Sequence, residues 1–244
     1  MHRFFCEFKI SPDNTINLSD KKHLHHIRDV LRLKTGEKIT LVDDRSREYL
    51  CAIGEYLEES INLTILKQLN KDKMNKVNLT IACSIPKRSK MEDIIDRLTQ
   101  LGVERIIPLE TERVIVRLDK NKKTQRLERW KKISQTASEQ SQRNTLPVID
   151  PVTCIEDVFR HAASFDLKLI PTLEDKRKNL KDVLNASKAK NILVLIGPEG
   201  DFSPQEIKLA KNAGFIPISL GNLVLRVETA AVAVASFIML NENH

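Results

Sequence analysis

Two glycine-containing segments near the end of the chain have residue types suited to holding a ligand. The first, IGPEGDFSPQE at 196–206, follows an apolar run that predicts a strand over 191–197, and Ser203 with Glu206 predicts the start of a helix. Ligands bind at the carboxyl ends of parallel strands, where glycine lets them approach the backbone. The segment has neither the Gly-Lys-Ser/Thr of a P-loop nor a G-x-G-x-x-G spacing. It therefore predicts a binding loop of another kind, with a tight strand-to-helix turn as the alternative.

The second segment, SLGNLVLRVETAA at 219–231, brings polar residues into apolar surroundings. Gly221 interrupts an expected strand, and Arg226, Glu228 and Thr229 come just before an apolar helix. An arginine in such surroundings is more often functional or paired than free. Glu228 and Thr229 have a second interpretation, because both residue types stabilise helix N-termini.

The positive charge of the chain is concentrated in its middle third. The chain has 40 Lys and Arg residues against 33 Asp and Glu residues, and the whole excess lies in 71–150. It peaks between Arg113 and Lys132, where a long basic helix is expected over 120–142. Such a local field is typical of a nucleic-acid-binding surface, with a solvated helix face as the alternative. The polar segment EQSQR at 139–143 is suited to hydrogen bonding with a base edge, with a frayed helix end in solvent as the alternative.

Metal and disulfide chemistry are not expected. No two of the four cysteines stand in C-x-x-C spacing, and three of them lie in apolar strand-like runs, which is typical of free buried thiols. Four of the six histidines lie in the first 26 residues, without an acidic or cysteine partner at ligand spacing. No signal peptide is visible, and the longest apolar run, 230–240, is too short to cross a bilayer. The sequence predicts a cytoplasmic protein without a metal.

Two regions of different secondary structure must position these segments. Residues 1–70 contain short apolar runs typical of strands and one helix that Ser19 is expected to cap, which predicts a small β-barrel or sandwich. The charged segment 71–76 is the expected linker. Over 77–244, strands alternate with helices, which predicts an α/β domain built on a parallel sheet.

Taken in order, the motifs resemble those of the 16S ribosomal RNA uracil N3-methyltransferases, a family of the SPOUT class. The resemblance covers essentially the whole chain. The chain departs from the usual family pattern at Asp201, Leu223 and Gln100. The matching segments are H-x-x-x-V-L-R at 26–32, K-M-E at 90–92, L-G-V at 101–103, E-Q-S-x-R at 139–143, I-G-P-E-G at 196–200, S-x-x-E at 203–206 and L-G-x-x-V-L-R-x-E-T-A at 220–230.

The resemblance implies a two-domain fold and a cofactor. It implies a PUA-like β-barrel over 1–70 that helps to hold RNA, and a SPOUT α/β domain over 77–244. In that domain, the resemblance implies a deep trefoil knot whose loops bind S-adenosylmethionine (SAM). It also implies that two copies of the chain form a homodimer, with the active site at the interface between them. The residues then expected to bind SAM are Leu169, Ile170, Pro171, Thr172, Gly197, Pro198, Glu199, Gly200, Ser219, Leu220, Gly221, Leu223, Val224, Leu225 and Thr229.

The implied reaction is methylation of N3 of a specific uridine in the 16S rRNA of the small ribosomal subunit. Uracil N3 carries a proton at neutral pH, so transfer requires loss of that proton and stabilisation of the negative charge that remains. The residues expected to serve this chemistry are Arg226, Arg143, Glu139 and Glu228, with the identity of the proton acceptor left open. The residues expected to bind RNA are Arg28, Arg32, Lys90, Arg113, Arg117, Arg126, Arg129 and Lys132.

Two alternative functions stay open. The chain could methylate another RNA site or a ribose 2′-hydroxyl, because none of these motifs fixes the target atom. It could also be a non-catalytic RNA-binding or ribosome-assembly protein. SAM binding distinguishes the second alternative, since a pure RNA-binding module has no use for the cofactor.

Overall fold

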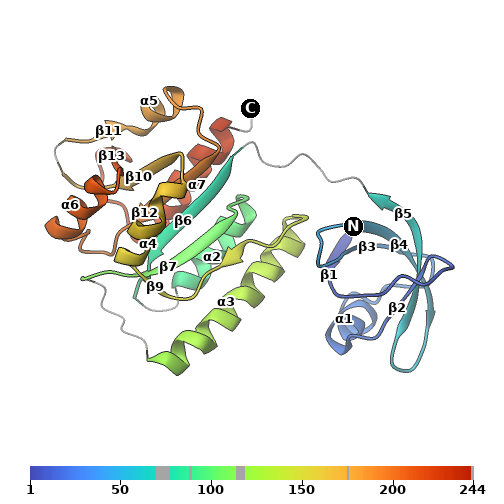
Figure 1. Ribbon diagram of the computed structural model, residues 1–244. Coiled ribbons are helices and arrows are strands. Elements are labelled where there is room, and N and C mark those ends of the chain that lie inside the picture. Colours follow the sequence, from blue (N-terminus) through green and yellow to red (C-terminus); the bar gives the residue numbers. More distant parts are fainter. Residues whose placement is uncertain (70–76, 88–89, 114–118, 175, 243–244) are drawn as a thin grey trace. The chain divides into compact units, whose positions relative to one another are not determined.

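The chain folds into two compact units (Figure 1). The first comprises Met1–Met74 and Ser138–Thr145, and the second comprises Asn75–Ala137 and Leu146–His244. The predicted linker, 71–76, lies outside the described residues, and the predicted domain boundaries stay a prediction. The computed structural model describes residues 1–69, 77–87, 90–113, 119–174 and 176–242.

The first unit is a five-stranded sheet packed against a short helical segment. Neighbouring strands are antiparallel except for the parallel pair β1 and β3. Within the described residues β1 and β2 do not pair, so the hydrogen-bonded ladder of the expected barrel is open between them. In the order β1-β3-β4-β5-β2, the strands are β1 (His2–Phe5), β3 (Lys38–Val42), β4 (Glu48–Tyr56), β5 (Ile61–Leu69) and β2 (Thr15–Leu18).

The helical segment of the first unit begins at Asp20 rather than at Ser19. The Asp20 carboxylate accepts a hydrogen bond from the His23 backbone N–H at 2.9 Å, so Asp20 is the N-cap and the prediction of Ser19 is wrong. Helix α1 (Lys21–His25) continues as a π-helical turn, His26–Val30.

The second unit contains a parallel sheet, which confirms the predicted α/β class. Its strands follow the order β11-β13-β10-β12-β6-β7-β8, and β9 also pairs with β7. The strands are β6 (Asn78–Ser84), β7 (Arg105–Glu110), β8 (Val148–Ile149), β9 (Thr153–Cys154), β10 (Leu167–Pro171), β11 (Lys178–Asn179), β12 (Asn191–Ile196) and β13 (Ile216–Ser219).

The helices of the second unit include the two whose ends the sequence marks most clearly. The predicted capping box starts α6, because Ser203 Oγ accepts from Glu206 N at 3.2 Å and the Glu206 carboxylate accepts from Ser203 N at 2.7 Å. Gly102 follows α2 with a φ of 88°, the left-handed conformation that often ends a helix. The helices are α2 (Lys90–Gln100), α3 (Lys120–Gln140), α4 (Ile155–His161), α5 (Leu180–Asn185), α6 (Pro204–Asn212) and α7 (Val227–Glu242), with a 3₁₀ turn at Ala162–Ser164.

Each face of the parallel sheet has its own apolar core. Along β12, Val194 points into one core and Leu195 into the other, since successive strand side chains alternate. Helices α2 and α7 cover the first face together with Trp130 of α3, and α4 and α6 cover the second (Figure 1). Helix α7 follows β13 in the chain, yet it packs against α2 and the central strand β6.

Two further observations concern the cysteines and the helices. All four cysteines are free, and burial raises the pKa of Cys6 and of Cys51 to about 12, so neither thiol ionises at neutral pH. This confirms the expectation of free thiols. No helix within the described parts of the chain is long and apolar enough to span a bilayer.

Candidate functional site

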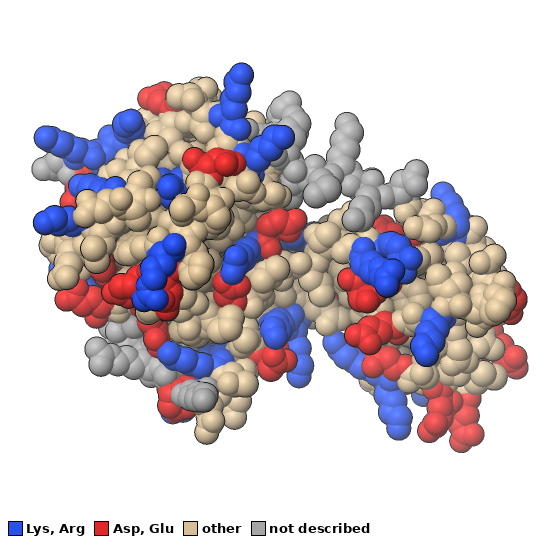
Figure 2. All heavy atoms as spheres, viewed as in Figure 1, with Lys and Arg blue, Asp and Glu red and all other residues tan. Residues whose placement is uncertain are grey.

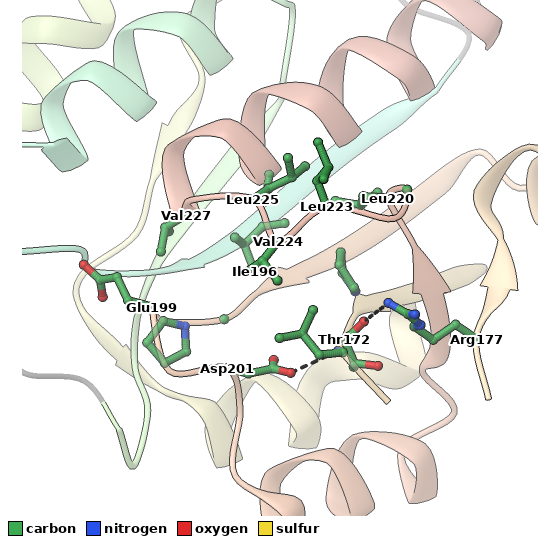
Figure 3. Close-up of a pocket in the computed structure, with 16 residues that line it drawn as sticks. Thr172, Arg177, Ile196, Glu199, Asp201, Leu220, Leu223, Val224, Leu225 and Val227 are labelled. Atoms are coloured by element: carbon green, nitrogen blue, oxygen red, sulfur yellow. Dashed lines mark hydrogen bonds between the residues drawn. The ribbon is translucent and has the colours of Figure 1, made fainter. Parts of the chain in front are cut away.

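A pocket lies at the carboxyl edge of the parallel sheet, where the loops after β10, β12 and β13 meet (Figure 3). These strands are neighbours and run in one direction, so their following loops share one edge. Most of the residues expected to bind SAM lie here. The lining consists of Pro171, Thr172, Leu173, Arg177, Ile196, Gly197, Pro198, Glu199, Asp201, Leu220, Gly221, Leu223, Val224, Leu225, Val227 and Ala230.

The loop after β12 needs one of its two predicted glycines for packing. A Cβ on Gly197 would lie 3.0 Å from the ring of the buried Phe202, which is tighter than most side-chain contacts and requires the ring to shift. A Cβ on Gly200 would lie 3.9 Å from Arg113 Cδ, an ordinary contact. Arg113 Nη1 donates to Gly200 O at 2.8 Å, so this predicted RNA-binding residue also supports the loop. Gly200 itself does not line the pocket.

The loop after β13 begins with a closed turn and continues as exposed apolar residues. Ser219 Oγ accepts from Gly221 N at 3.2 Å and donates to Gly221 O at 3.1 Å. Gly221 has a φ of 115°, which side-chain-bearing residues rarely adopt. Leu223 and Val224 are 79% and 73% exposed although they line the pocket. Exposed apolar side chains in a pocket wall are suited to contact with a ligand or another protein surface.

The backbone of the loop after β10 is hydrogen-bonded to two charged side chains of the pocket lining. The carbonyl of the buried Thr172 accepts from Arg177 Nη1 at 3.1 Å, and Leu173 N donates to Asp201 Oδ2 at 3.0 Å (Figure 3). Glu199 lies at the opposite end of the pocket in this view, and its carboxylate accepts from Lys87 N at 3.2 Å. The pocket therefore combines apolar side chains with carboxylates and loop backbone.

Besides Gly200, four of the residues expected to bind SAM lie outside the pocket lining. Leu169 and Ile170 are fully buried, one in each core, because strand side chains alternate between the two faces of the sheet. Their side chains are therefore not available to a ligand in the pocket. Ser219 and Thr229 do not line it either: Ser219 closes the turn described above, and Thr229 is an exposed residue of α7.

Arg226 and Glu228, both expected to be catalytic, have different surroundings. Arg226 is exposed, and its side chain forms no hydrogen bond or ion pair within the described residues. Glu228 pairs with Lys90, the first residue of α2, and both side chains are partly buried. Partial burial acts to raise the pKa of Glu228, but the hydrogen bond from Lys90, the Glu228 backbone N–H and the charges of Lys90 and Arg226 outweigh it and lower that pKa. Lys90 is thus committed to an ion pair rather than free for phosphate.

Glu139 and Arg143, the other expected catalytic residues, belong to the first unit. Arg143 donates to Thr145 through Nε at 3.2 Å to the carbonyl and through Nη2 at 3.4 Å to Oγ1. Its own carbonyl accepts from Arg3 Nη1 at 2.8 Å, and Arg3 also forms an ion pair with the buried Glu48 at 2.9 Å. Glu139 is half-buried. The end of α3 is therefore held by hydrogen bonds within the first unit.

The residues expected to bind RNA differ in how far their charge is already paired. Arg129 forms an ion pair with Glu92 at 2.7 Å, and Arg28 with Asp29 at 3.1 Å. Arg126 and Lys132 on α3, and the exposed Arg32 in the first unit, have no side-chain partner within the described residues. Arg117 lies outside the described residues.

Several pocket residues carry weak signals in the sequence. Ile196 and Val227 flank the two glycine-containing segments and could have been found from their position. Arg177 and Leu173 follow a predicted strand without a distinctive motif. Asp201 was noted only as a departure from a pattern, although Asp is one of the few residue types that tolerate a left-handed backbone in a glycine-rich turn. Among the described residues, no group of three or more His, Cys, Asp or Glu side chains is arranged to hold a metal ion.

Comparisons with known proteins agree with this arrangement of two parts. An RNA methyltransferase domain family matches residues 73–239, and an RNA methyltransferase PUA domain family matches residues 18–65. The ribosomal RNA small subunit methyltransferase E of Rickettsia conorii is 30% identical over 245 residues, covering 100% of this chain and 97% of that protein. The protein of the same name from Bacillus subtilis is 27% identical, covering 98% of this chain and 96% of its own length.

Solved structures resemble the whole chain as well. A ribosomal RNA small subunit methyltransferase E from Neisseria gonorrhoeae, bound to S-adenosyl methionine, has a TM-score of 0.85 at 30% identity and covers 99% of this chain and 98% of its own. A methyltransferase from Legionella pneumophila, in complex with bound SAM, has a TM-score of 0.86 at 30% identity and covers 98% and 97%.

Proposed function

Since this chain belongs to the family of RNA methyltransferases named ribosomal RNA small subunit methyltransferase E, we propose that it transfers a methyl group from SAM to N3 of a specific uridine in 16S rRNA. The observation that carries this proposal is the pocket formed by the three strand-end loops. A cytoplasmic location follows from a ribosomal substrate.

The residues of the pocket fit SAM. The apolar side chains of Ile196, Leu220 and Leu225 suit an adenine ring, and the loop backbone offers donors and acceptors for its edge. Glu199 and Asp201 contribute two carboxylates to the lining against one guanidinium, that of Arg177. A lining with excess negative charge favours a ligand that carries a positive sulfonium.

The residues of this chain contribute to the reaction by orienting the reactants and by stabilising the charge that develops. When bound, SAM supplies a methyl group on a positive sulfur that a nucleophile displaces in line. Arg226 is the residue best placed to stabilise the uracil ring after N3 loses its proton, because it follows the pocket loop directly and its guanidinium has no partner within the described residues. Preorganised positive charge at a developing anion lowers the barrier to transfer.

Glu228 and Glu139 remain the candidates for the proton acceptor. The ion pair with Lys90 keeps Glu228 ionised at neutral pH, which is the state a base requires, but it also makes Glu228 a weaker base. Glu139 lies in the last turn of α3, four residues before Arg143 in the sequence and in the same unit. We infer that Arg143 is a second stabiliser of charge.

RNA is held by cations of both units. In the second unit, Arg126, Lys132 and Arg113 are the proposed phosphate contacts. In the first unit, whose match to a PUA domain supports RNA binding, they are Arg28 and Arg32. Neutralising phosphates releases counterions, so binding weakens as salt rises.

We further infer a knotted SPOUT domain and a homodimer. The chain passes from β12 beyond β10 to β13 and then returns to pack α7 against β6, a path that supports threading of the last segment. The exposure of Leu223, Val224 and Leu240 supports a partner surface that covers them. Sedimentation of the purified protein tests the dimer, and a monomer at micromolar concentration would contradict it.

The reaction itself is tested with methyl-labelled SAM and unmodified small ribosomal subunits, followed by digestion of the RNA and identification of the labelled nucleoside. We expect 3-methyluridine from 16S rRNA. Label in a ribose or in another base would overturn the uracil assignment and keep a methyltransferase. Binding of SAM without any transfer would favour a non-catalytic RNA-binding protein.

A further inference from the structure

Asp201 has a backbone conformation that glycine adopts far more readily. Its φ is 59°, in the left-handed region where a side chain is unfavourable. Asp201 N donates to Pro198 O at 3.0 Å, which closes the turn after β12. A non-glycine residue in this region costs backbone free energy, which interactions of its side chain can offset.

The Asp201 carboxylate accepts hydrogen bonds from two different loops. Oδ1 accepts from Phe202 N at 2.8 Å in its own loop, and Oδ2 accepts from Leu173 N at 3.0 Å in the loop after β10. Hydrogen bonds to an ionised acceptor are among the stronger ones in proteins. Figure 3 shows the bond that crosses from Asp201 to the neighbouring loop, at the wall of the pocket.

Among the described residues, the other restraints on the loop after β10 act at its start and within the loop itself. Thr172 N donates to Ile218 O of β13 at 3.4 Å, Arg177 Nη1 donates to the Thr172 carbonyl at 3.1 Å, and Glu174 N donates to Thr172 Oγ1 at 3.4 Å. Glu174 also pairs with Lys211 at 2.5 Å through partly exposed side chains, and such an ion pair fixes a loop weakly. Leu173 lines the pocket with 55% of its surface exposed, and its backbone N–H is tied to the loop after β12 by Asp201.

We propose that Asp201 is a positioning residue that ties the loops after β10 and β12 together and thereby sets the affinity of the pocket for SAM, an inference that rests on the proposed function. Without the hydrogen bond from Leu173 N to Asp201, the loop at Leu173 is less ordered in the unbound protein. Cofactor binding then has to order this loop, and the entropy lost makes binding weaker. The link acts on cofactor affinity and not on the reacting atoms.

The test replaces Asp201 by glycine, which removes both acceptors without adding backbone strain. We expect Asp201→Gly to bind SAM about tenfold more weakly by calorimetry, which is the scale of two lost hydrogen bonds. The KM for SAM should rise by a similar factor, while kcat at saturating SAM and the KM for RNA stay within twofold. Exchange of the Leu173 amide with solvent should become faster.

Asp166→Ala is the matched control. Asp166 also ties β10 to β12, since its carboxylate accepts from Lys190 N at 2.9 Å and Asn191 N at 2.8 Å, but it does so at the opposite edge of the sheet. We expect this variant to lose stability without losing SAM affinity. Asp201→Asn, which keeps one acceptor and the tolerance for a left-handed backbone, should have intermediate affinity.

The outcomes separate this inference from the proposed function. Unchanged SAM affinity in Asp201→Gly, or an equal loss in Asp166→Ala, would overturn the role of Asp201 alone. A wild-type protein that binds no SAM would overturn the proposed function, and this inference with it.

Discussion

Most of the basic side chains described on helix α3 are paired with a carboxylate, whereas the arginine in the loop that precedes α7 is not. On α3, Lys122, Lys123, Arg129 and Lys131 each form an ion pair with a nearby carboxylate. In the loop before α7, Arg226 is exposed and has no side-chain partner within the described residues. On the face of the second unit seen in Figure 2, basic and acidic side chains are interspersed rather than separated into patches.

The difference shows that a count of basic residues overstates the positive charge available to RNA. A cation that is already paired has to break that contact before it binds phosphate, and a surface ion pair contributes up to about 1 kcal/mol. Arg126 and Lys132 are the cations of α3 without such a contact among the described residues. Arg226, which has no such contact among the described residues and follows the pocket loop directly, is therefore expected to matter more than any one cation on the helix.

The largest effect is expected from Arg226→Ala. Removing the charge that stabilises the uracil anion should lower kcat about 10²- to 10³-fold. The affinity for SAM, measured by calorimetry, should stay within twofold of wild type. Turnover near the wild-type rate would exclude Arg226 from the reaction, and Arg129→Ala serves as a control in which a paired arginine is lost.

Gly197→Ala and Gly200→Ala form a matched pair within the pocket loop. The Cβ at 197 would crowd the buried Phe202 ring and force the ring or the loop to shift, whereas the Cβ at 200 meets only an ordinary contact. Overpacking costs about 1–3 kcal/mol, so Gly197→Ala should weaken SAM binding roughly tenfold and lower the melting temperature. Gly200→Ala should change neither by much, and equal losses in both variants would show that the packing contact is not the cause.

The salt dependence of RNA binding separates free from paired cations. Losing a cation that contacts one phosphate should reduce the slope of log K against log salt by about 0.7 to 0.9. We expect such a change for Arg126→Ala and for Lys132→Ala in filter-binding titrations. Arg129→Ala should change the slope less, because that side chain is already paired with Glu92. Equal changes in all three variants would contradict the distinction.

The smallest effect concerns the ion pair of Lys90 and Glu228. The pKa of Glu228 is lower in the folded protein than its ordinary value of 4.5, so its ionised form stabilises the fold. This stabilisation is present above pH 4.5 and is lost as the pH falls through the lower folded value. A double-mutant cycle with Lys90→Met and Glu228→Gln should give a coupling of at most about 1 kcal/mol at pH 7 that vanishes in acid. A coupling that persists in acid would contradict this assignment.

Much of the fold could be predicted because its longer elements repeat simple patterns. The continuous apolar run at 191–197 predicted β12, and Ser203 with Glu206 predicted the start of α6. The two-residue strands β8, β9 and β11 and the short helices α4 and α5 were not predicted, because so few residues show no period.

The pocket was predicted better than the contacts that shape it. Glycine motifs next to predicted strands were enough to find the loops after β12 and β13. Side chains of Leu169 and Ile170 were assigned to the ligand because the sequence does not say which face of a strand they occupy. The pairing of Lys90 with Glu228 joins residues 138 positions apart, and the bond from Leu173 N to Asp201 depends on how two loops meet. Both follow from the tertiary structure and leave no local signal.

The position of α7 has a consequence for the order of events during synthesis. The chain is made from its N-terminus, and β6 is complete long before the final helix exists. Until α7 arrives, the face of β6 that carries Leu79 and Ile81 lacks its cover, and the loop that supplies Leu220 to the pocket is missing. A chain whose synthesis stops before α7 is made therefore has an exposed apolar face and an incomplete pocket. The ability to bind the cofactor is acquired only after this helix has been made.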